Sequence, residues 1–440
     1  MIPGLRLLRC LKAGAFLAMA LSLSGCGAWL GEKEAPPLPG TRIPILFSGT
    51  AADASPSAGP VTLPEPQPRS DWPQAGGNAR HDSGHLDAAP DLRRVWSVTA
   101  AGGGYGLSSP PVVAEDRVYI LGADYQLTAH ALDSGKLLWS ARLENPEGPG
   151  EAFGGGLAFS DGLLFLTTGY GVIAAHDAET GAEVWRQTVG VPLRTAPAVD
   201  GGAVLAVAVD NRVIARAAAD GRALWTRENF AAAAGLVGTG VPAIAGDVVI
   251  APQSSGDLRA LWLSSGEILW ERSLASGNRF SGLADFTGIR ASPVIAAGAV
   301  YAVSNAGRLA AFDLVSGFEL WQRRAGGVNT PLVAGNTVFF LAADGRLMAL
   351  SRQDGALRWQ ADLPVWADPA ERTDPLVWTG PLLLNGRLVL GGSGSELLIL
   401  SALDGQETGR IALDGPLLSP PAAAGGLLIV RTPGKVTAFR

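Results

Sequence analysis

The apolar positions of this 440-residue chain fall in short runs and show no helical spacing. Apolar or alternating segments of four to six residues, such as 117–121 and 299–303, lie between Gly, Asp and Pro residues. Segments of this length and pattern are typical of β-strands. Six groups of segments open with a small residue, a proline and an apolar pair. Proline suits a first or edge strand, because there its missing N–H removes no hydrogen bond between strands. The pattern therefore predicts an all-β protein built from repeated four-stranded units.

A ladder of tryptophans marks the end of these units. Seven tryptophans recur at intervals of 38 to 51 residues: Trp96, Trp139, Trp185, Trp225, Trp270, Trp321 and Trp359. All but the first follow a glycine by four residues, which fixes the register of the repeat. A repeat of about 40–45 residues with four strands has the length of a β-propeller blade. The large flat indole is suited to packing one blade against the next.

The number of units predicts how the ring closes. Six units end at a tryptophan, and a seventh carries Gly409 where the tryptophan would stand. The eighth unit starts near residue 418 and stops at Arg440, before its fourth strand, whereas segment 92–98 supplies a spare strand near the other end. An N-terminal strand that completes the C-terminal blade removes the free edges of an open array. The sequence therefore predicts an eight-bladed β-propeller closed in this way, with seven blades as the alternative.

The amino terminus has the pattern of a secretory signal. Three basic residues precede a short apolar core, and the run ends in Leu-Ser-Gly-Cys at residues 23–26, which resembles the bacterial lipobox. We therefore expect residues 1–25 to be a signal peptide and Cys26 to carry acyl chains that anchor the protein to a membrane. Gly27, in place of the aspartate of inner-membrane lipoproteins, favours the outer membrane. Cys10 lies in the removed segment, so no disulfide is expected in the mature chain.

The segment between the anchor and the repeats has a different composition. Residues 26–90 are rich in Pro, Ala, Gly and Ser, a composition that cannot bury enough apolar surface to fold alone. We therefore predict a semi-extended tether over 26–90 and a propeller over 91–440. An apolar patch at 43–47 is expected to dock on the propeller or on a partner.

Several of these features occur together in one family. The lipobox, the Pro-rich segment with Leu-Pro-Gly-Thr-Arg at 38–42, the segment 71–77 and eight quinoprotein-like repeats of the Gly-x-x-x-Trp type resemble the BamB family of the α-proteobacterial kind. These are propeller lipoproteins of the outer-membrane β-barrel assembly (BAM) machine. The resemblance implies a non-catalytic scaffold that binds the periplasmic POTRA region of BamA, joins the other BAM subunits and assists insertion of unfolded outer-membrane proteins. It also implies a lipid-anchored protein at the outer membrane that faces the periplasm.

The resemblance also points to a partner-binding loop. In the family, an apolar residue followed by Leu-Arg precedes the strand of the third blade, and here Val191, Leu193 and Arg194 stand at that place. A leucine beside an arginine is a common hot-spot pair at protein interfaces. An ordinary loop between blades is the alternative. The family's other contact loop carries acidic residues, whereas this chain has Gly-Ile-Arg at 288–290.

An enzyme is the first competing class, because quinoprotein dehydrogenases share the predicted architecture. They bind pyrroloquinoline quinone and a metal ion, which needs a carboxylate base, oxygen ligands and stacking groups. Asp133, Asp177 and Asp313 recur at equivalent turn positions, as turn chemistry predicts. His130 and His176 occupy equivalent strand positions in different blades and so do not converge. We therefore predict no catalytic residue, no metal and no cofactor.

Two further classes differ in what they would bind. The net charge of −6 and the lack of basic patches with stacking aromatics argue against nucleic acid. A ligand-sensing periplasmic propeller stays open, and the long aromatic segment 363–378, which holds Trp366 and Trp378, is its candidate surface.

Overall fold

The structure is a computed structural model that describes residues 58–89, 91–100, 109–144, 154–193, 195–228, 240–275, 288–305, 307–417 and 419–440. All described residues belong to the compact unit Gly49–Arg440. Every regular element in the described ranges is a strand. Those ranges contain no helix that is long and apolar enough to cross a membrane. Cys26 lies outside the described residues.

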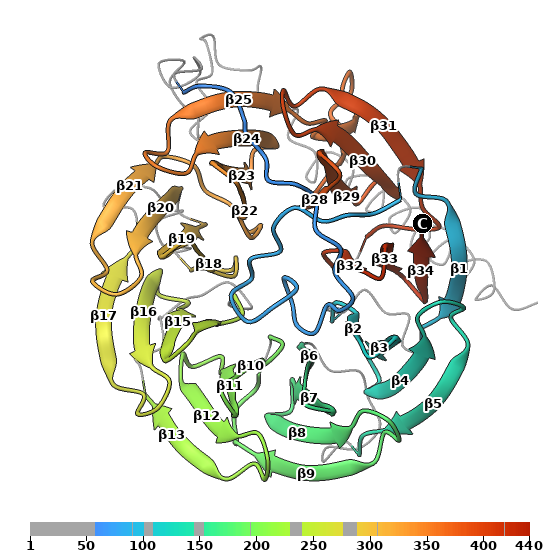
Figure 1. Ribbon diagram of the computed structural model, residues 1–440, viewed down its shortest axis with the longest axis vertical. Coiled ribbons are helices and arrows are strands. Elements are labelled where there is room, and N and C mark those ends of the chain that lie inside the picture. The colour runs from blue at the N-terminus through green and yellow to red at the C-terminus, as the bar shows by residue number, and fades with distance from the viewer. Residues whose placement is uncertain are drawn as a thin grey trace, which may run out of the picture. The chain divides into compact units, whose positions relative to one another are not determined.

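The described strands form eight four-stranded antiparallel sheets arranged in a ring, which confirms the predicted eight-bladed β-propeller (Figure 1). Blade 1 contains β2 (Val112–Ala114), β3 (Arg117–Leu121), β4 (Gln126–Ala131) and β5 (Leu137–Arg142). Blade 2 contains β6 (Gly155–Ser160), β7 (Leu163–Thr168), β8 (Val172–Asp177) and β9 (Glu183–Thr188). Blade 3 contains β10 (Ala198–Asp200), β11 (Ala203–Val207), β12 (Val213–Ala217) and β13 (Ala223–Arg227). Blade 4 contains β14 (Ala243–Ala245), β15 (Val248–Pro252), β16 (Asp257–Trp262) and β17 (Ile268–Ser273).

The second half of the ring repeats this order from the inside outwards. Blade 5 contains β18 (Val294–Ala296), β19 (Ala299–Ser304), β20 (Arg308–Asp313) and β21 (Glu319–Arg323). Blade 6 contains β22 (Leu332–Ala334), β23 (Thr337–Leu341), β24 (Arg346–Ser351) and β25 (Leu357–Asp362). Blade 7 contains β28 (Trp378–Leu384), β29 (Arg387–Gly392), β30 (Glu396–Ser401) and β31 (Glu407–Ala412). Blade 8 contains β32 (Ala422–Ala424), β33 (Leu427–Thr432), β34 (Lys435–Phe439) and β1 (Arg94–Thr99), and the hairpin of β26 (Trp366–Asp368) and β27 (Thr373–Pro375) lies between blades 6 and 7.

The tryptophan ladder joins neighbouring blades at seven of the eight seams, as its spacing predicts. At seven seams the indole Nε1–H donates to a backbone carbonyl of the following blade at 2.7–3.1 Å. Each ring lies against the glycine of the neighbouring turn: a Cβ built on Gly317, for example, would lie 2.6 Å from Trp270, and that glycine has φ +65°. Only glycine combines this close approach with the left-handed backbone. The Gly-x-x-x-Trp spacing therefore encodes the packing of one blade on the next.

The ring closes where the sequence predicts. Strand β1 pairs antiparallel with β34, with Trp96 opposite Ala438, and so completes blade 8. Arg431 of β33 spans the same closure, because its Nη1 donates to the carbonyls of Ser109 and Leu121 in blade 1 at 2.8 Å each. Burial of the Arg431 side chain lowers its pKa to about 10. The closure is therefore held by backbone pairing and by a buried guanidinium.

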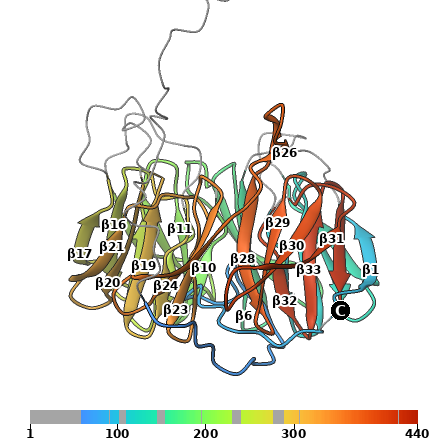
Figure 2. The same ribbon diagram turned by 90° about the horizontal axis from the view of Figure 1, so that it is seen from above.

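The amino-terminal part of the propeller unit differs from the predicted tether. Residues 58–89, which we call the strap, pack across one end of the ring (Figure 2). The strap forms hydrogen bonds with the innermost strand or first turn of all eight blades, through the pairs Trp72–Val113, Pro73–Phe159, Gln74–Val199, Ala79–Ile244, Arg80–Ile295, Thr62–Asn336, Leu86–Leu383 and Arg69–Gly425. Trp72 and Leu86 are buried in the core of blades 1, 7 and 8. The strap has no core of its own, but it pairs with backbone groups at the strand ends that would otherwise lack partners.

Candidate partner-binding face

The topology gives the propeller two different ends. The turns between first and second strands lie at the end that the strap covers, which we call the strap face. Because strands alternate in direction, the turns between second and third strands and the connections between blades lie at the opposite end, the loop face. The β26–β27 hairpin projects from this end in Figure 2. The described part of the chain thus leaves the loop face as the end without a strap.

The predicted partner-binding loop lies on the loop face, between β9 and β10. The N–H of Val189 donates to the carbonyl of Gly171 at 2.8 Å, and the N–H of Leu193 donates to that of Thr168 at 3.2 Å. On the other side, Leu193 forms a bridge with Ala208 of blade 3. The loop is therefore fixed by backbone bonds to the two blades that it joins.

The three predicted contact residues differ in their surroundings. Leu193 has no exposed surface and lies in the core that blades 2 and 3 share. Val191 is half-buried against that core, and Arg194 lies outside the described residues. A side chain without exposed area contacts no partner unless the loop opens. In this conformation Leu193 fixes the loop, and Val191 presents the apolar surface.

The residues considered for catalysis have structural roles where the structure describes them. Asp177 and Asp313 each accept hydrogen bonds from the hydroxyl and N–H of the residue three positions later, which lowers the pKa of both carboxyls. His130 and His176 each bond through Nδ1 to the carbonyl of a turn glycine in their own blade. No group of three or more His, Cys, Asp or Glu side chains in the described ranges could hold a metal ion. The turn and strand interpretations of these residues are confirmed.

The aromatic segment before blade 7 also has a structural role. Trp378 is buried in the core of blades 6 and 7, and its Nε1–H donates to the carbonyl of Pro364 at 2.7 Å. Trp366 is half-buried at the start of β26. Trp378 therefore offers little surface for a ligand.

The strap carries the polar residues that sequence reasoning missed. Gln74 bonds to Val199 with both ends of its amide, at 2.6 and 2.9 Å. His81 Nδ1 lies 2.8 Å from the carbonyl of Pro293, and burial lowers the pKa of its imidazole to about 4. The Arg69 guanidinium lies 5.7 Å from the centre of the Trp72 ring, and burial lowers its pKa. These side-chain contacts hold the strap in one position on the ring. In the sequence, only the tryptophan among the prolines of this segment indicated such contacts.

Fold and site together define a quinoprotein-type eight-bladed propeller with one strapped end and one looped end. The sequence model described as "Outer membrane protein assembly factor BamB" matches residues 88–150 and 126–361. The chain belongs to this family. The predicted resemblance is confirmed at the level of the family.

Individual relatives agree with this assignment. The chain is 26% identical over 277 residues to "Outer membrane protein assembly factor BamB" of Moranella endobia, which covers 61% of this chain and 71% of the relative. The protein of the same name from Salmonella typhimurium is 28% identical, with coverages of 61% and 70%. An uncharacterised protein of Rickettsia prowazekii is 26% identical over 256 residues, with coverages of 58% and 61%.

Solved structures show the same fold at low sequence identity. BamB from Moraxella catarrhalis superposes with a TM-score of 0.67 at 18% identity and covers 79% of this chain and 99% of its own. A quinohemoprotein alcohol dehydrogenase from Comamonas testosteroni superposes with a TM-score of 0.65 at 14% identity, with coverages of 84% and 80%. Because BamB and an alcohol dehydrogenase superpose about equally well, the ring alone does not indicate a function.

Proposed function

We propose that this protein is a non-catalytic scaffold subunit of the outer-membrane protein assembly machine, which binds the POTRA region of BamA and assists insertion of β-barrel proteins. The observation that carries the proposal is the match of the assembly-factor family model across most of the ring. The side chains considered for catalysis serve turns and strands instead. A scaffold function needs a rigid body, and the ladder and the strap supply one.

The loop face is the proposed contact surface for BamA. Loop 189–193 is fixed by backbone bonds to blades 2 and 3, so it presents Val191 without an ordering cost on binding. An apolar contact beside the Arg194 charge has the chemistry of an interface hot spot. Leu193 takes part by holding the loop from within the core.

The loop proposal predicts a loss of binding from two changes in the loop. The double variant Val191→Asp with Arg194→Glu is expected to reduce co-purification of BamA about tenfold or more, because it adds a buried charge and reverses another at the interface. Because Val191 is half-buried against the core of blades 2 and 3, the melting temperature of the double variant is measured first, and the comparison uses protein that stays folded. Val315→Asp makes the same substitution at an exposed valine of a turn at the strap end of blade 5, and should leave co-purification unchanged. Equal recovery of BamA with the double variant would place the interface elsewhere.

The membrane anchor is a second proposal, because Cys26 ends a lipobox-like run. Acyl chains on this cysteine would hold the propeller at the outer membrane, on the periplasmic side, since more than one chain exceeds the marginal binding of a single one. Cys26→Ser is expected to shift the protein from the membrane fraction to the soluble periplasmic fraction after osmotic shock. In cells depleted of BamA, full retention of Cys26→Ser in the membrane fraction would rule out lipid anchoring.

A further inference from the structure

Three seams between blades are filled by an arginine of the preceding blade. Arg227, Arg272 and Arg323 each lie two residues after a ladder tryptophan. Each donates from Nε to the carbonyl of the glycine that the tryptophan faces in the next blade, at 2.5–2.7 Å. At these three of the eight seams, the space holds a guanidinium that points at the turn of the following blade; the other five seams have Val98, Ala141, Gln187, Ala361 or Ile411 at this position.

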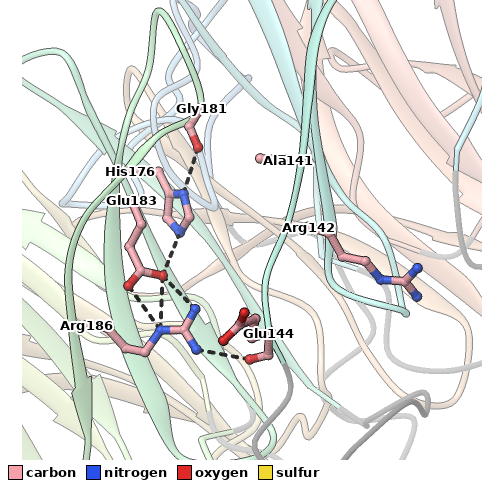
Figure 3. A pocket seen from close by; sticks show the side chains of 7 residues that line it. All are labelled: Ala141, Arg142, Glu144, His176, Gly181, Glu183 and Arg186. Atoms are coloured by element: carbon pink, nitrogen blue, oxygen red, sulfur yellow. Dashed lines mark hydrogen bonds and ion pairs between the residues drawn. The ribbon is translucent and has the colours of Figure 1, made fainter.

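The seam between blades 1 and 2 lacks this arginine. Its equivalent position is Ala141, and a cavity of about 540 Å³ opens there between β5 and the strands β8 and β9 (Figure 3). Across the cavity stands His176, whereas the same position holds Leu261 in blade 4 and Leu350 in blade 6. A small residue on one wall and a polar ring on the other therefore leave an open polar site.

His176 presents an unused acceptor to this cavity. Its Nδ1–H donates to the carbonyl of Gly181 at 3.0 Å, so in the neutral ring Nε2 carries the lone pair. The side chain is 4% exposed, and Nε2 is buried without a hydrogen-bond partner, 3.8 Å from Glu183 Oε2. The equivalent His130 of blade 1 has Thr128 Oγ1 at 3.2 Å from its Nε2, but blade 2 has Ala174 in place of that threonine.

The cavity is lined by two acidic residues, Glu144 and Glu183, and two basic residues, Arg142 and Arg186. Arg186 and Glu183 pair through bonds of 2.6–3.2 Å, and Arg186 also donates to the backbone carbonyl of Glu144 at 3.0 Å. Arg142 points away from this cluster in Figure 3 and lies 3.6 Å from Asp124. Asp124 does not line the cavity, so the charged pair beside His176 is Glu183 with Arg186.

We propose that the seam between blades 1 and 2 binds the side chain of an arginine from an extended segment of a protein partner. The guanidinium would enter the space that Arg227, Arg272 and Arg323 fill at other seams. It would donate to His176 Nε2 and the Glu183 carboxylate, and its planar fork can serve two such acceptors at once. The inference goes beyond the scaffold function and does not rest on it.

Direct titration tests the proposal. The probe is the blocked peptide acetyl-Gly-Arg-Gly-amide, added to the purified full-length protein and followed by calorimetry and by the ¹⁵N shift of His176 Nε2. We expect saturable binding of the arginine peptide with a shift of the Nε2 resonance. The citrulline peptide has the same shape without the charge, and the lysine peptide has the charge without the fork; both should bind at least about tenfold more weakly. Absence of saturable binding, or equal binding of citrulline or lysine, would overturn the proposal.

Two variants test the site itself. Ala141→Arg should supply the missing guanidinium from within, keep the melting temperature and weaken peptide binding at least about tenfold. His176→Leu restores the apolar residue of blades 4 and 6 and should also abolish binding. Ala361→Arg, the same substitution at the seam of blades 6 and 7, is the matched control and should bind as the parent does. Retained peptide binding by folded Ala141→Arg or His176→Leu protein would contradict the assignment. The scaffold proposal does not depend on this result, so BamA should still co-purify with either variant.

Discussion

Trp96→Ala is expected to lower the free energy of unfolding by about 3–5 kcal/mol, the range for removing a large buried aromatic side chain. Trp96 is 7% exposed, and its Nε1–H donates to the carbonyl of Leu132 at 2.8 Å. Its ring covers Gly135, which has φ +70° and no room for a side chain. The residue lies on β1, whose pairing with β34 closes the ring, so the loss weakens both the closure and the first seam. Urea denaturation followed by tryptophan fluorescence and far-ultraviolet circular dichroism measures the change.

The neighbouring residue provides the control for this prediction. Val95 lies on the same strand but is 45% exposed, so Val95→Ala should change the unfolding free energy by no more than about 0.5 kcal/mol. A Trp96→Ala loss as small as that of Val95→Ala would mean that β1 does not close the propeller in solution.

Acidification is expected to destabilise the strap through His81. Burial lowers the pKa of this imidazole to about 4 from an ordinary value of 6.5. The folded protein therefore holds His81 neutral, whereas the unfolded chain binds a proton below pH 6.5. The resulting stabilisation is complete above pH 6.5 and is lost as the pH falls towards 4. At about 1.4 kcal/mol per pH unit, the loss between pH 6.5 and pH 5 is about 2 kcal/mol.

A conservative substitution isolates this effect. His81 has φ +58° and bonds through Nδ1 to the carbonyl of Pro293. Asparagine tolerates that backbone and places an amide N–H where Nδ1 stands, but it does not titrate. His81→Asn should therefore flatten the difference in unfolding free energy between pH 6.5 and pH 5 by about 2 kcal/mol. An identical pH dependence in the two proteins would show that His81 is not buried as described.

The fold was predictable because the ladder is a local signal repeated in register. Each tryptophan and its glycine specify one contact between neighbouring blades, so the spacing predicts six blades directly, and the unit at Gly409 and the spare strand at 92–98 supply the other two. Gly409 stands where an eighth tryptophan would be expected, and the ring closure accounts for this exception. A tryptophan there would face the turn between the third and fourth strands of blade 8, but β34 and β1 are not joined by a turn. The closure thus explains the one missing member of the ladder.

The strap and the seam cavity were not predictable in the same way. The Pro-rich composition of the strap describes the segment as a whole and does not indicate the roles of Trp72, Gln74 and His81. The partners of these three residues lie in the inner strands of distant blades. The seam cavity depends on Ala141 and His176, which come from different blades. Each residue is unremarkable alone, and only alignment of the repeats shows a small residue where three other seams have an arginine.

Affinity purification of the full-length protein from native membranes, followed by mass spectrometry and by analysis of bound small molecules, tests the scaffold function most directly. We predict that BamA co-purifies with the protein in a stable complex, without a bound quinone, and that the Val191→Asp, Arg194→Glu variant recovers BamA about tenfold less well. Recovery of a bound quinone without BamA, or of neither, would contradict the scaffold function.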